Sequence, residues 1–132
     1  MTDKAETVNN TSGYYANRDG YRGPYAEYEQ LIVSSLQAGD AILDIGCGRT
    51  FPMAKKWLQT GAEVSGLDPV IEPEGLLPGV KGLRGSAETI PCADESYDLI
   101  ASCAVLEHLE QPGAVFQEFY RILKPGGKAV LL

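Results

Sequence analysis

The chain has 132 residues, 44% of them hydrophobic, which is enough for one globular domain with a sizeable core. Its formal net charge of −7 argues against nucleic acid or an anionic membrane surface as a partner. No apolar run is long enough to cross a bilayer, and three cysteines with one histidine form neither a disulfide framework nor a zinc-ligand pattern. We therefore expect a cytoplasmic protein with reduced thiols and no bound metal.

The N-terminal stretch is polar and rich in glycine, which predicts a mobile, tyrosine-rich arm over 1–23 ahead of a domain at 24–132. Tyrosine combines an apolar ring with a polar tip, so these side chains either cover a ligand or pack the arm against the domain. Pro24 suits the first turn of a helix, and apolar residues at spacings of three and four predict one that ends near Gly39. The tyrosines of the arm are Tyr14, Tyr15 and Tyr21, and Tyr25 and Tyr28 follow in the expected helix.

Residues 41–48 read Ala-Ile-Leu-Asp-Ile-Gly-Cys-Gly, which predicts a buried parallel strand followed by a tight turn. A helix is expected over 51–60, so the glycine loop would present its amide groups beside a helix N-terminus, where open α/β sheets bind ligands. A carboxylate such as Asp44 is costly in an apolar strand unless it is paired, and the ammonium group of a bound amino-acid moiety would serve. A dinucleotide fingerprint would need a glycine where Phe51 stands. The alternative is an ordinary strand and turn with a solvated Asp44.

A second strand is expected over 62–68, and it ends in an acid, Asp68. An acid about twenty residues beyond a glycine loop, at the tip of the next strand, can hydrogen-bond both ribose hydroxyls of a nucleoside. The alternative is a turn residue ahead of Pro69. Prolines and glycines over 70–83 predict an irregular crossover with at most one helical turn, closed by a short strand at 80–83.

The pattern of the remaining sequence predicts a strand at 97–102, one or two helical turns at 104–110 and a helix that begins at Pro112. The turns at 104–110 contain the only histidine of the sequence, His108. A Lys-Pro-Gly-Gly sequence then ends this helix and leads into a final strand at 128–132. The apolar residues that repeat at i, i+4 and i+8 in this helix are Val115, Phe116, Phe119, Tyr120 and Leu123.

A series of short motifs runs through the second half of the chain. They are Gly-Ser-Ala-Glu-Thr-Ile-Pro at 85–91, Ser-Tyr-Asp-Leu-Ile at 96–100, Leu-Glu-His-Leu at 106–109 and Glu-Phe-Tyr-Arg-Ile-Leu-Lys-Pro-Gly-Gly at 118–127. With the glycine loop and Asp68, they resemble the small class I S-adenosylmethionine-dependent methyltransferases of type 11, in order and spacing, over residues 41–132. The resemblance implies an α/β, Rossmann-like, open and mostly parallel sheet with flanking helices. It also implies methyl transfer from S-adenosylmethionine to a small-molecule acceptor.

The resemblance assigns roles to individual positions. It implies that Asp44 holds the methionine part of S-adenosylmethionine directly or through water, that Asp68 takes the ribose hydroxyls and that Pro69 lies against the adenine. Ala87 would offer its amide to the adenine edge, whereas Ser86 stands where the family usually has Asp and so removes an acceptor for the adenine amino group. The full implied set comprises Asp44, Gly46, Cys47, Gly48, Asp68, Pro69, Ser86, Ala87, Ser102 and Cys103, of which the glycine loop and the last two residues line the methionine end.

The acceptor side of the site is less defined. His108 stands where family members have substrate-side residues and is the candidate catalytic group together with the N-terminal tyrosines; a structural hydrogen bond is the alternative for it. A base helps only when the acceptor must lose a proton, because in-line methyl transfer depends mainly on proximity and orientation. Two other functions stay open. One is a binding or interaction module without turnover, and the other is a nicotinamide-dependent oxidoreductase, which Phe51 and Asp44 disfavour.

Three departures from the family pattern concern the cofactor loop, the crossover and the end of the chain. Thr50 replaces a usual third glycine, and the crossover at 70–83 lacks the usual helix. The family fold continues with a further helix and an antiparallel strand pair, so the apolar strand at 129–132 would lie at an exposed sheet edge, which proteins normally cover. We expect a truncated form, a fragment or a homodimer formed through this edge.

Overall fold

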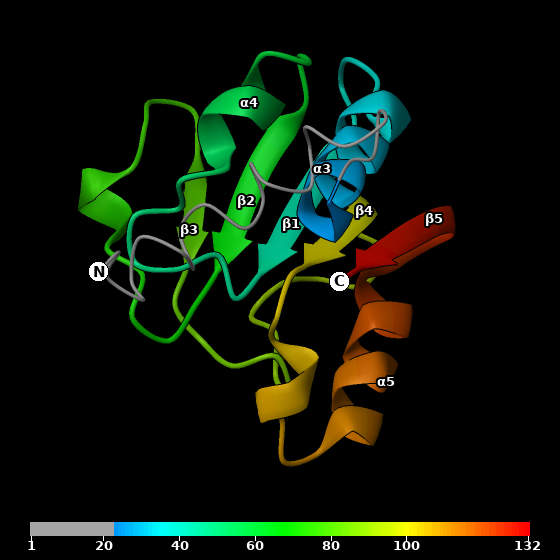
Figure 1. The fold of residues 1–132 in the computed structure, drawn as a ribbon. Coiled ribbons are helices and arrows are strands. Elements are labelled where there is room, and N and C mark those ends of the chain that lie inside the picture. Colours follow the sequence, from blue (N-terminus) through cyan, green and yellow to red (C-terminus); the bar gives the residue numbers. More distant parts are fainter. Residues whose placement is uncertain (1–22) are drawn as a thin grey trace, which may run out of the picture.

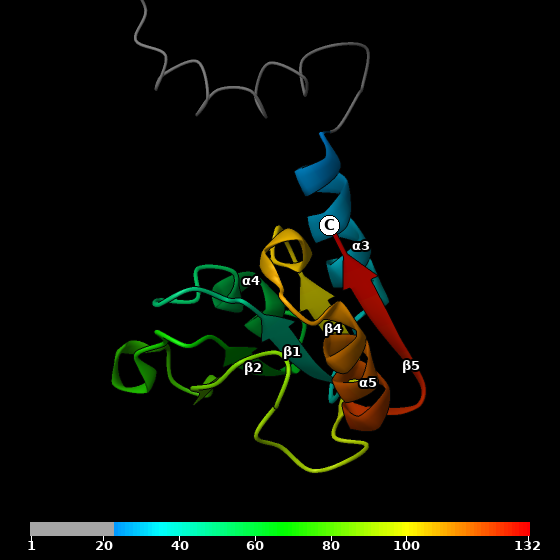
Figure 2. The ribbon, with the colours of Figure 1, turned by 90° about the horizontal axis from the view of Figure 1, so that it is seen from below.

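A computed structural model describes residues 23–132 and shows one five-stranded sheet with helices on both faces (Figures 1 and 2). The strand order is β3-β2-β1-β4-β5, and every pair of neighbouring strands is parallel. This arrangement confirms the Rossmann-like sheet expected from the sequence. The expected arm over 1–23 lies outside the described residues, apart from Gly23.

The helices and strands occur along the chain in the expected order. The strands are β1 (Ala41–Ile45), β2 (Glu63–Leu67), β3 (Lys81–Leu83), β4 (Tyr97–Ser102) and β5 (Leu123–Leu131). The helices are α3 (Pro24–Ser35), α4 (Ala54–Leu58) and α5 (Pro112–Ile122), with single 3-10 turns at η1 (Pro73–Gly75) and η2 (Leu106–His108). Over residues 23–132, none of the helices has the length and apolar character needed to cross a membrane.

Strand β1 is buried on both faces, and it divides the core into two layers. Ile42 faces the layer filled by α3 and α4, which includes the wholly buried Trp57. Leu43 faces the layer filled by α5 and by the connection between β3 and β4. Figure 2 shows α3 and α4 on one side of the sheet and the β3–β4 connection on the other. Continuous apolar burial of this kind is typical of a central parallel strand.

Helix α4 is shorter than the helix expected over 51–60. Phe51 adopts a left-handed backbone conformation, with φ of 49°, and its side chain is only 2% exposed. Its ring packs edge-to-face against Trp57, with ring centroids 5.7 Å apart. Burial of Phe51 therefore bends the chain ahead of the helix, which begins at Ala54.

Helix α5 buries only part of its apolar repeat. Val115, Phe119 and Ile122 face the core, whereas Phe116 is 48% exposed and Tyr120 is 88% exposed. Phe116 and Tyr120 therefore lie outside the stripe that meets the core. They repeat at the same helical spacing as Val115 and Phe119, but each lies one residue further along the chain. Its side chain is therefore turned by about 100° around the helix axis from the face that meets the sheet.

Strand β5 begins directly after α5 rather than at residue 128. Leu123 pairs with Tyr97, a register shift follows, and Lys128 pairs with Leu99. The Lys-Pro-Gly-Gly segment therefore lies inside the strand as an irregularity, with Gly126 at φ of 80°. An edge strand tolerates proline and a bulge of this kind, which is why these residues do not delay the start of the strand.

Candidate binding site

The carboxyl ends of β1, β2 and β4 lie side by side, and Ile45 pairs there with both Leu67 and Ser102. This end of the strands is the carboxyl edge of the sheet, as distinct from its edge strands β3 and β5. The loops that leave these strands bring the predicted residues of the two halves of the chain together. A Cβ atom at Gly46 would lie 2.4 Å from Val105 Cγ2, so only glycine allows the segment before η2 to approach the loop. This edge is the position at which open parallel sheets bind ligands.

The amides of the glycine loop are already used within the protein. Gly46 and Cys47 donate to the Leu67 carbonyl oxygen, at 2.8 and 3.2 Å, and Gly48 donates to Asp68 Oδ2 at 3.0 Å. The expectation that the loop presents these amides to a ligand beside a helix N-terminus is therefore wrong. The carbonyl oxygens of Gly46 and Cys47 accept no hydrogen bond from the described residues. The loop thus offers acceptors, which suit a positively charged donor.

Asp44 is the most unusual group at this edge. It is only 7% exposed, and none of the described residues forms a hydrogen bond with its carboxylate. Burial, followed by the charge of Asp68, raises the pKa of Asp44 to about 8. A buried carboxyl group of this kind is stabilised either by a proton or by a bound cation.

The Asp68 carboxylate is held at the tip of β2 by two backbone amides. Gly48 donates to Oδ2, and Val70 donates to Oδ1 at 2.9 Å. Each oxygen keeps a further lone pair for an external donor such as a hydroxyl group. Pro69 is exposed and Val70 is 54% exposed, so both present apolar surface beside the carboxylate. Val70 was not predicted from the sequence, although its place directly after Asp68 and Pro69 was a usable signal.

Ser86 and Ala87 lie on the connection that leaves the carboxyl end of β3. Ala87 is 7% exposed and belongs to the core layer that also contains Ile45 and Leu67. Its amide donates to no acceptor among residues 23–132, which leaves one free backbone donor near this edge. Ser86 is exposed, and it forms an isolated bridge with Thr89.

Two predicted residues at the tip of β4 have different environments. Ser102 is 1% exposed, and its hydroxyl donates to the Ile45 carbonyl oxygen at 3.3 Å, so it links two strands. Cys103 is partly exposed, and burial, followed by the charges of Asp44 and Glu107, raises the pKa of its thiol. Cys103 is therefore the member of this pair that can face a ligand.

The side chain of His108 on η2 is 79% exposed. Its Nε2 lies 3.8 Å from the Glu107 carboxylate, and its imidazole forms no structural hydrogen bond with the described part of the chain. Thr50, at the position of the usual third glycine, is also exposed. Among residues 23–132, no group of three or more His, Cys, Asp or Glu side chains is placed to hold a metal ion.

Helix α3 brings two tyrosines toward Asp44. Tyr28 is 6% exposed and packs in the core, and burial, followed by the charge of Asp44, raises the pKa of its hydroxyl. Tyr25 is 44% exposed, and its hydroxyl donates to Met53 Sδ at 3.1 Å. Tyr28 therefore has the packing role, while Tyr25 borders the site. The structure does not describe Tyr14, Tyr15 and Tyr21.

The edge therefore combines three kinds of polar group. Asp44 and the loop carbonyl oxygens can accept from an ammonium group, Asp68 can accept from hydroxyl groups, and the Ala87 amide can donate to a planar base. Pro69 and Val70 add exposed apolar surface beside Asp68.

Comparisons with known proteins identify a family for this chain. A family described as methyltransferase domain matches residues 43–131, which is more than half of the chain. The chain is 29% identical over 125 residues to a sterol 24-C-methyltransferase of Pneumocystis carinii (strain B80), covering 86% of this chain and 33% of that protein. It is 33% identical over 114 residues to methyltransferase GfsG of Streptomyces halstedii, covering 79% of this chain and 40% of that protein.

A solved structure from Anabaena variabilis ATCC 29413, provisionally named a methyltransferase from an antibiotic biosynthesis pathway, has the same fold. It superposes with a TM-score of 0.70 and 27% identity, covering 81% of this chain and 44% of that one. The chain thus spans less than half the length of each of these proteins.

Proposed function

Because the chain belongs to the class I S-adenosylmethionine-dependent methyltransferase family, we propose that it binds S-adenosylmethionine at the carboxyl edge of its sheet and transfers the methyl group to a small-molecule acceptor. The observation that carries the proposal is the unpaired, buried carboxylate of Asp44 beside the acceptor-rich glycine loop. This combination is unfavourable in an empty site and favourable with a cationic ligand.

The residues present fit the cofactor. Asp44 and the carbonyl oxygens of Gly46 and Cys47 would hold the ammonium of the methionine part, and Asp68 would accept from the ribose hydroxyls. The adenine would lie against Pro69 and Val70. The free Ala87 amide would donate to the adenine edge, and Cys103 would line the methionine end, whereas Ser102 supports the strands beneath.

When bound, S-adenosylmethionine supplies a methyl group on a positively charged sulfur. The contribution of the chain is to orient that group and to exclude water, which is the main requirement of such a transfer. Tyr25 and Cys103 are both at least partly exposed, and they would border the methionine end and contact the acceptor. His108, exposed on the turn after β4, is the candidate base where the acceptor must lose a proton.

A small, neutral or cationic, partly apolar acceptor suits the chain best. The net charge of −7 opposes nucleic acid. Two relatives are named after small apolar molecules: a sterol 24-C-methyltransferase and a ubiquinone biosynthesis O-methyltransferase of Bordetella avium. Tyr25 adds an aromatic surface at the border of the site.

Calorimetric titration with S-adenosylhomocysteine tests the cofactor site. We expect saturable binding by the wild type, and roughly a tenfold to hundredfold weaker affinity in Asp44→Asn and in Asp68→Asn, because each variant loses a charged hydrogen-bond partner. Asp40→Asn is the matched control, since Asp40 lies just before β1 at the opposite edge and accepts from the Gln37 amide. Its affinity should equal that of the wild type.

Two results would overturn or narrow the proposal. Absence of binding by the folded wild type, or an equal loss of affinity in all three variants, would remove the cofactor site from this edge. Binding without methyl transfer to any acceptor in a small-molecule panel would instead support the alternative function, a binding module without turnover. Binding of a nicotinamide dinucleotide in place of S-adenosylhomocysteine would support the oxidoreductase.

A further inference from the structure

The connection between β3 and β4, residues 84–96, has no helix or strand of its own. It nevertheless carries Ser86 and the free amide of Ala87 at the binding edge. Hydrogen bonds within it are few. Thr89 donates to the Ser86 carbonyl oxygen at 3.2 Å, Cys92 donates to that of Ile90 at 2.8 Å, and the Ser96 hydroxyl donates to that of Ala93 at 2.6 Å. A segment of this kind needs partners elsewhere to hold one conformation.

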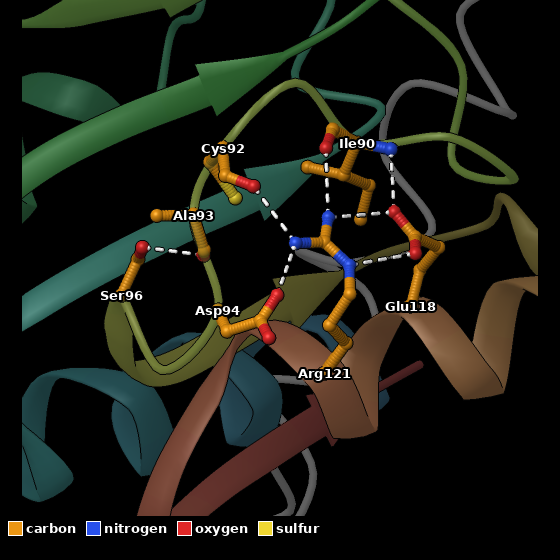
Figure 3. Close-up of polar contacts among 7 residues, drawn as sticks. All are labelled: Ile90, Cys92, Ala93, Asp94, Ser96, Glu118 and Arg121. Atoms are coloured by element: carbon orange, nitrogen blue, oxygen red, sulfur yellow. Dashed lines mark hydrogen bonds and ion pairs between the residues drawn. The ribbon is translucent and has the colours of Figure 1, made fainter.

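Arg121, in the last turn of α5, supplies most of those partners (Figure 3). Its Nη1 donates to the Cys92 carbonyl oxygen at 2.8 Å and to Asp94 Oδ1 at 2.9 Å, and its Nη2 donates to the Ile90 carbonyl oxygen at 2.9 Å. One planar guanidinium thus joins two backbone carbonyls and a carboxylate of the connection, a geometry that lysine cannot reproduce.

Glu118, one turn earlier on the same helix, completes the cluster. Its Oε2 accepts from the Ile90 amide at 2.7 Å, and its two oxygens accept from Arg121 Nε and Nη2 at 2.8 and 2.9 Å. Ile90 is therefore held at both its amide and its carbonyl by two side chains of α5. The Glu118 and Arg121 side chains are only 18% and 29% exposed, whereas that of Asp94 is 76% exposed and contributes less.

Ile90 and Ala87 are both anchored in the same core layer, at 3% and 7% exposure. The turn between them is closed by the bridge of Ser86 with Thr89. Fixing the backbone of Ile90 therefore fixes where the Ala87 amide lies relative to Leu67 and the adjoining Asp68.

We propose that Arg121 and Glu118 are positioning residues for adenine recognition, and that they act through Ile90 on the Ala87 amide. This inference rests on the proposed function. Because Ser86 offers no carboxylate to the adenine amino group, discrimination of the base falls largely on this single amide. The two side chains touch neither the cofactor nor the acceptor, and their effect should appear in base selectivity.

The test compares binding of S-adenosylhomocysteine with its inosine analogue, in which the ring nitrogen N1 carries a hydrogen and can no longer accept from an amide. We expect the wild type to prefer the adenine compound roughly tenfold, the size of one hydrogen bond with a buried amide left unpaired. In Arg121→Met the preference should fall to about twofold or less. Arg121→Lys and Glu118→Gln, which alter fewer contacts, should give intermediate values.

Lys124→Met is the matched control, because it removes a neighbouring ion pair, Lys124 to Asp98 at 3.1 Å, that does not contact the connection. It should keep the preference of the wild type. An unchanged preference in Arg121→Met and Arg121→Lys, or an equal loss in Lys124→Met, would overturn the inference. Should Arg121→Met fail to fold, Arg121→Lys and Glu118→Gln decide the question. Loss of all binding in the wild type would instead contradict the proposed function.

Discussion

Asp44 is the residue whose burial is most costly at the carboxyl edge of the sheet. Its carboxylate lies near the carboxyl end of the central strand, β1, with no hydrogen bond from the described residues, and close enough to Asp68 for the two charges to repel. A partner of opposite charge would relieve both effects. The cost of burying Asp44 without such a partner should therefore be measurable in the unliganded protein.

The stability of the unliganded chain should fall as pH rises from 5.5 to 8. Folding raises the pKa of Asp44 to about 8, whereas an aspartate in the unfolded chain has a pKa of about 3.9. The folded state therefore binds the proton more tightly, and its stability decreases with pH between these two values. We expect a loss of roughly 1–3 kcal/mol over this window in the wild type and little loss in Asp44→Asn.

Urea titration followed by the fluorescence of Trp57, the single tryptophan, measures this difference. Asp40→Asn again serves as the control and should keep the pH dependence of the wild type. The same dependence in Asp44→Asn as in the wild type would show that another group is responsible.

At the residue scale, the sequence located the polar groups but not their orientation. The Gly-x-Gly turn and the acid after the second strand predicted where Asp44 and Asp68 lie, since both follow from strand ends in a parallel sheet. The use of the Gly46 amide by Leu67 could not be predicted, because it depends on the pairing of β1 with β2. The approach of Tyr28 to Asp44 depends on how α3 packs, which is equally remote in sequence.

At the scale of elements, β2 and the glycine loop fit through Gly66. A Cβ atom there would lie 2.6 Å from Cys47 Sγ and 2.7 Å from Phe51 Cδ1. Gly66→Ala should therefore displace the glycine loop, lower the free energy of unfolding by about 1–3 kcal/mol and weaken S-adenosylhomocysteine binding. Thermal unfolding and calorimetry measure the two effects.

Gly75→Ala is the control for this substitution, because no atom lies within 4 Å of a Cβ built at that position and its φ is not left-handed. It should change stability by no more than about 0.5 kcal/mol and leave binding unchanged. Equal behaviour of the two variants would mean that the loop does not rely on the space beside Gly66.

The elements themselves were largely predictable, and the exceptions share a cause. Strand β4 and the start of α5 at Pro112 were expected because apolar runs and proline mark them locally. The early start of β5 and the exposure of Phe116 and Tyr120 were not, because pairing with β4 and the orientation of α5 on the sheet decide them. Contacts with remote strands overrode the local signals in each case.

At the scale of the whole molecule, β5 forms one edge of the sheet and pairs with β4. Leu131 and Leu132 near its end are 36% and 43% exposed. The homodimer expected through this edge stays a prediction. Light scattering at micromolar concentration would show the mass of two chains if it forms, and a monomer would contradict it.

The central claim is that one edge of the sheet binds S-adenosylmethionine, and an amide-resolved NMR titration with S-adenosylhomocysteine tests it most directly. We predict saturable shifts at the carboxyl edge, in residues 44–48, 68–70, 86–87 and 103–105. Residues 37–41 and 124–128, at the opposite edge, should not shift. Shifts centred on that opposite edge, or none that saturate, would contradict the account.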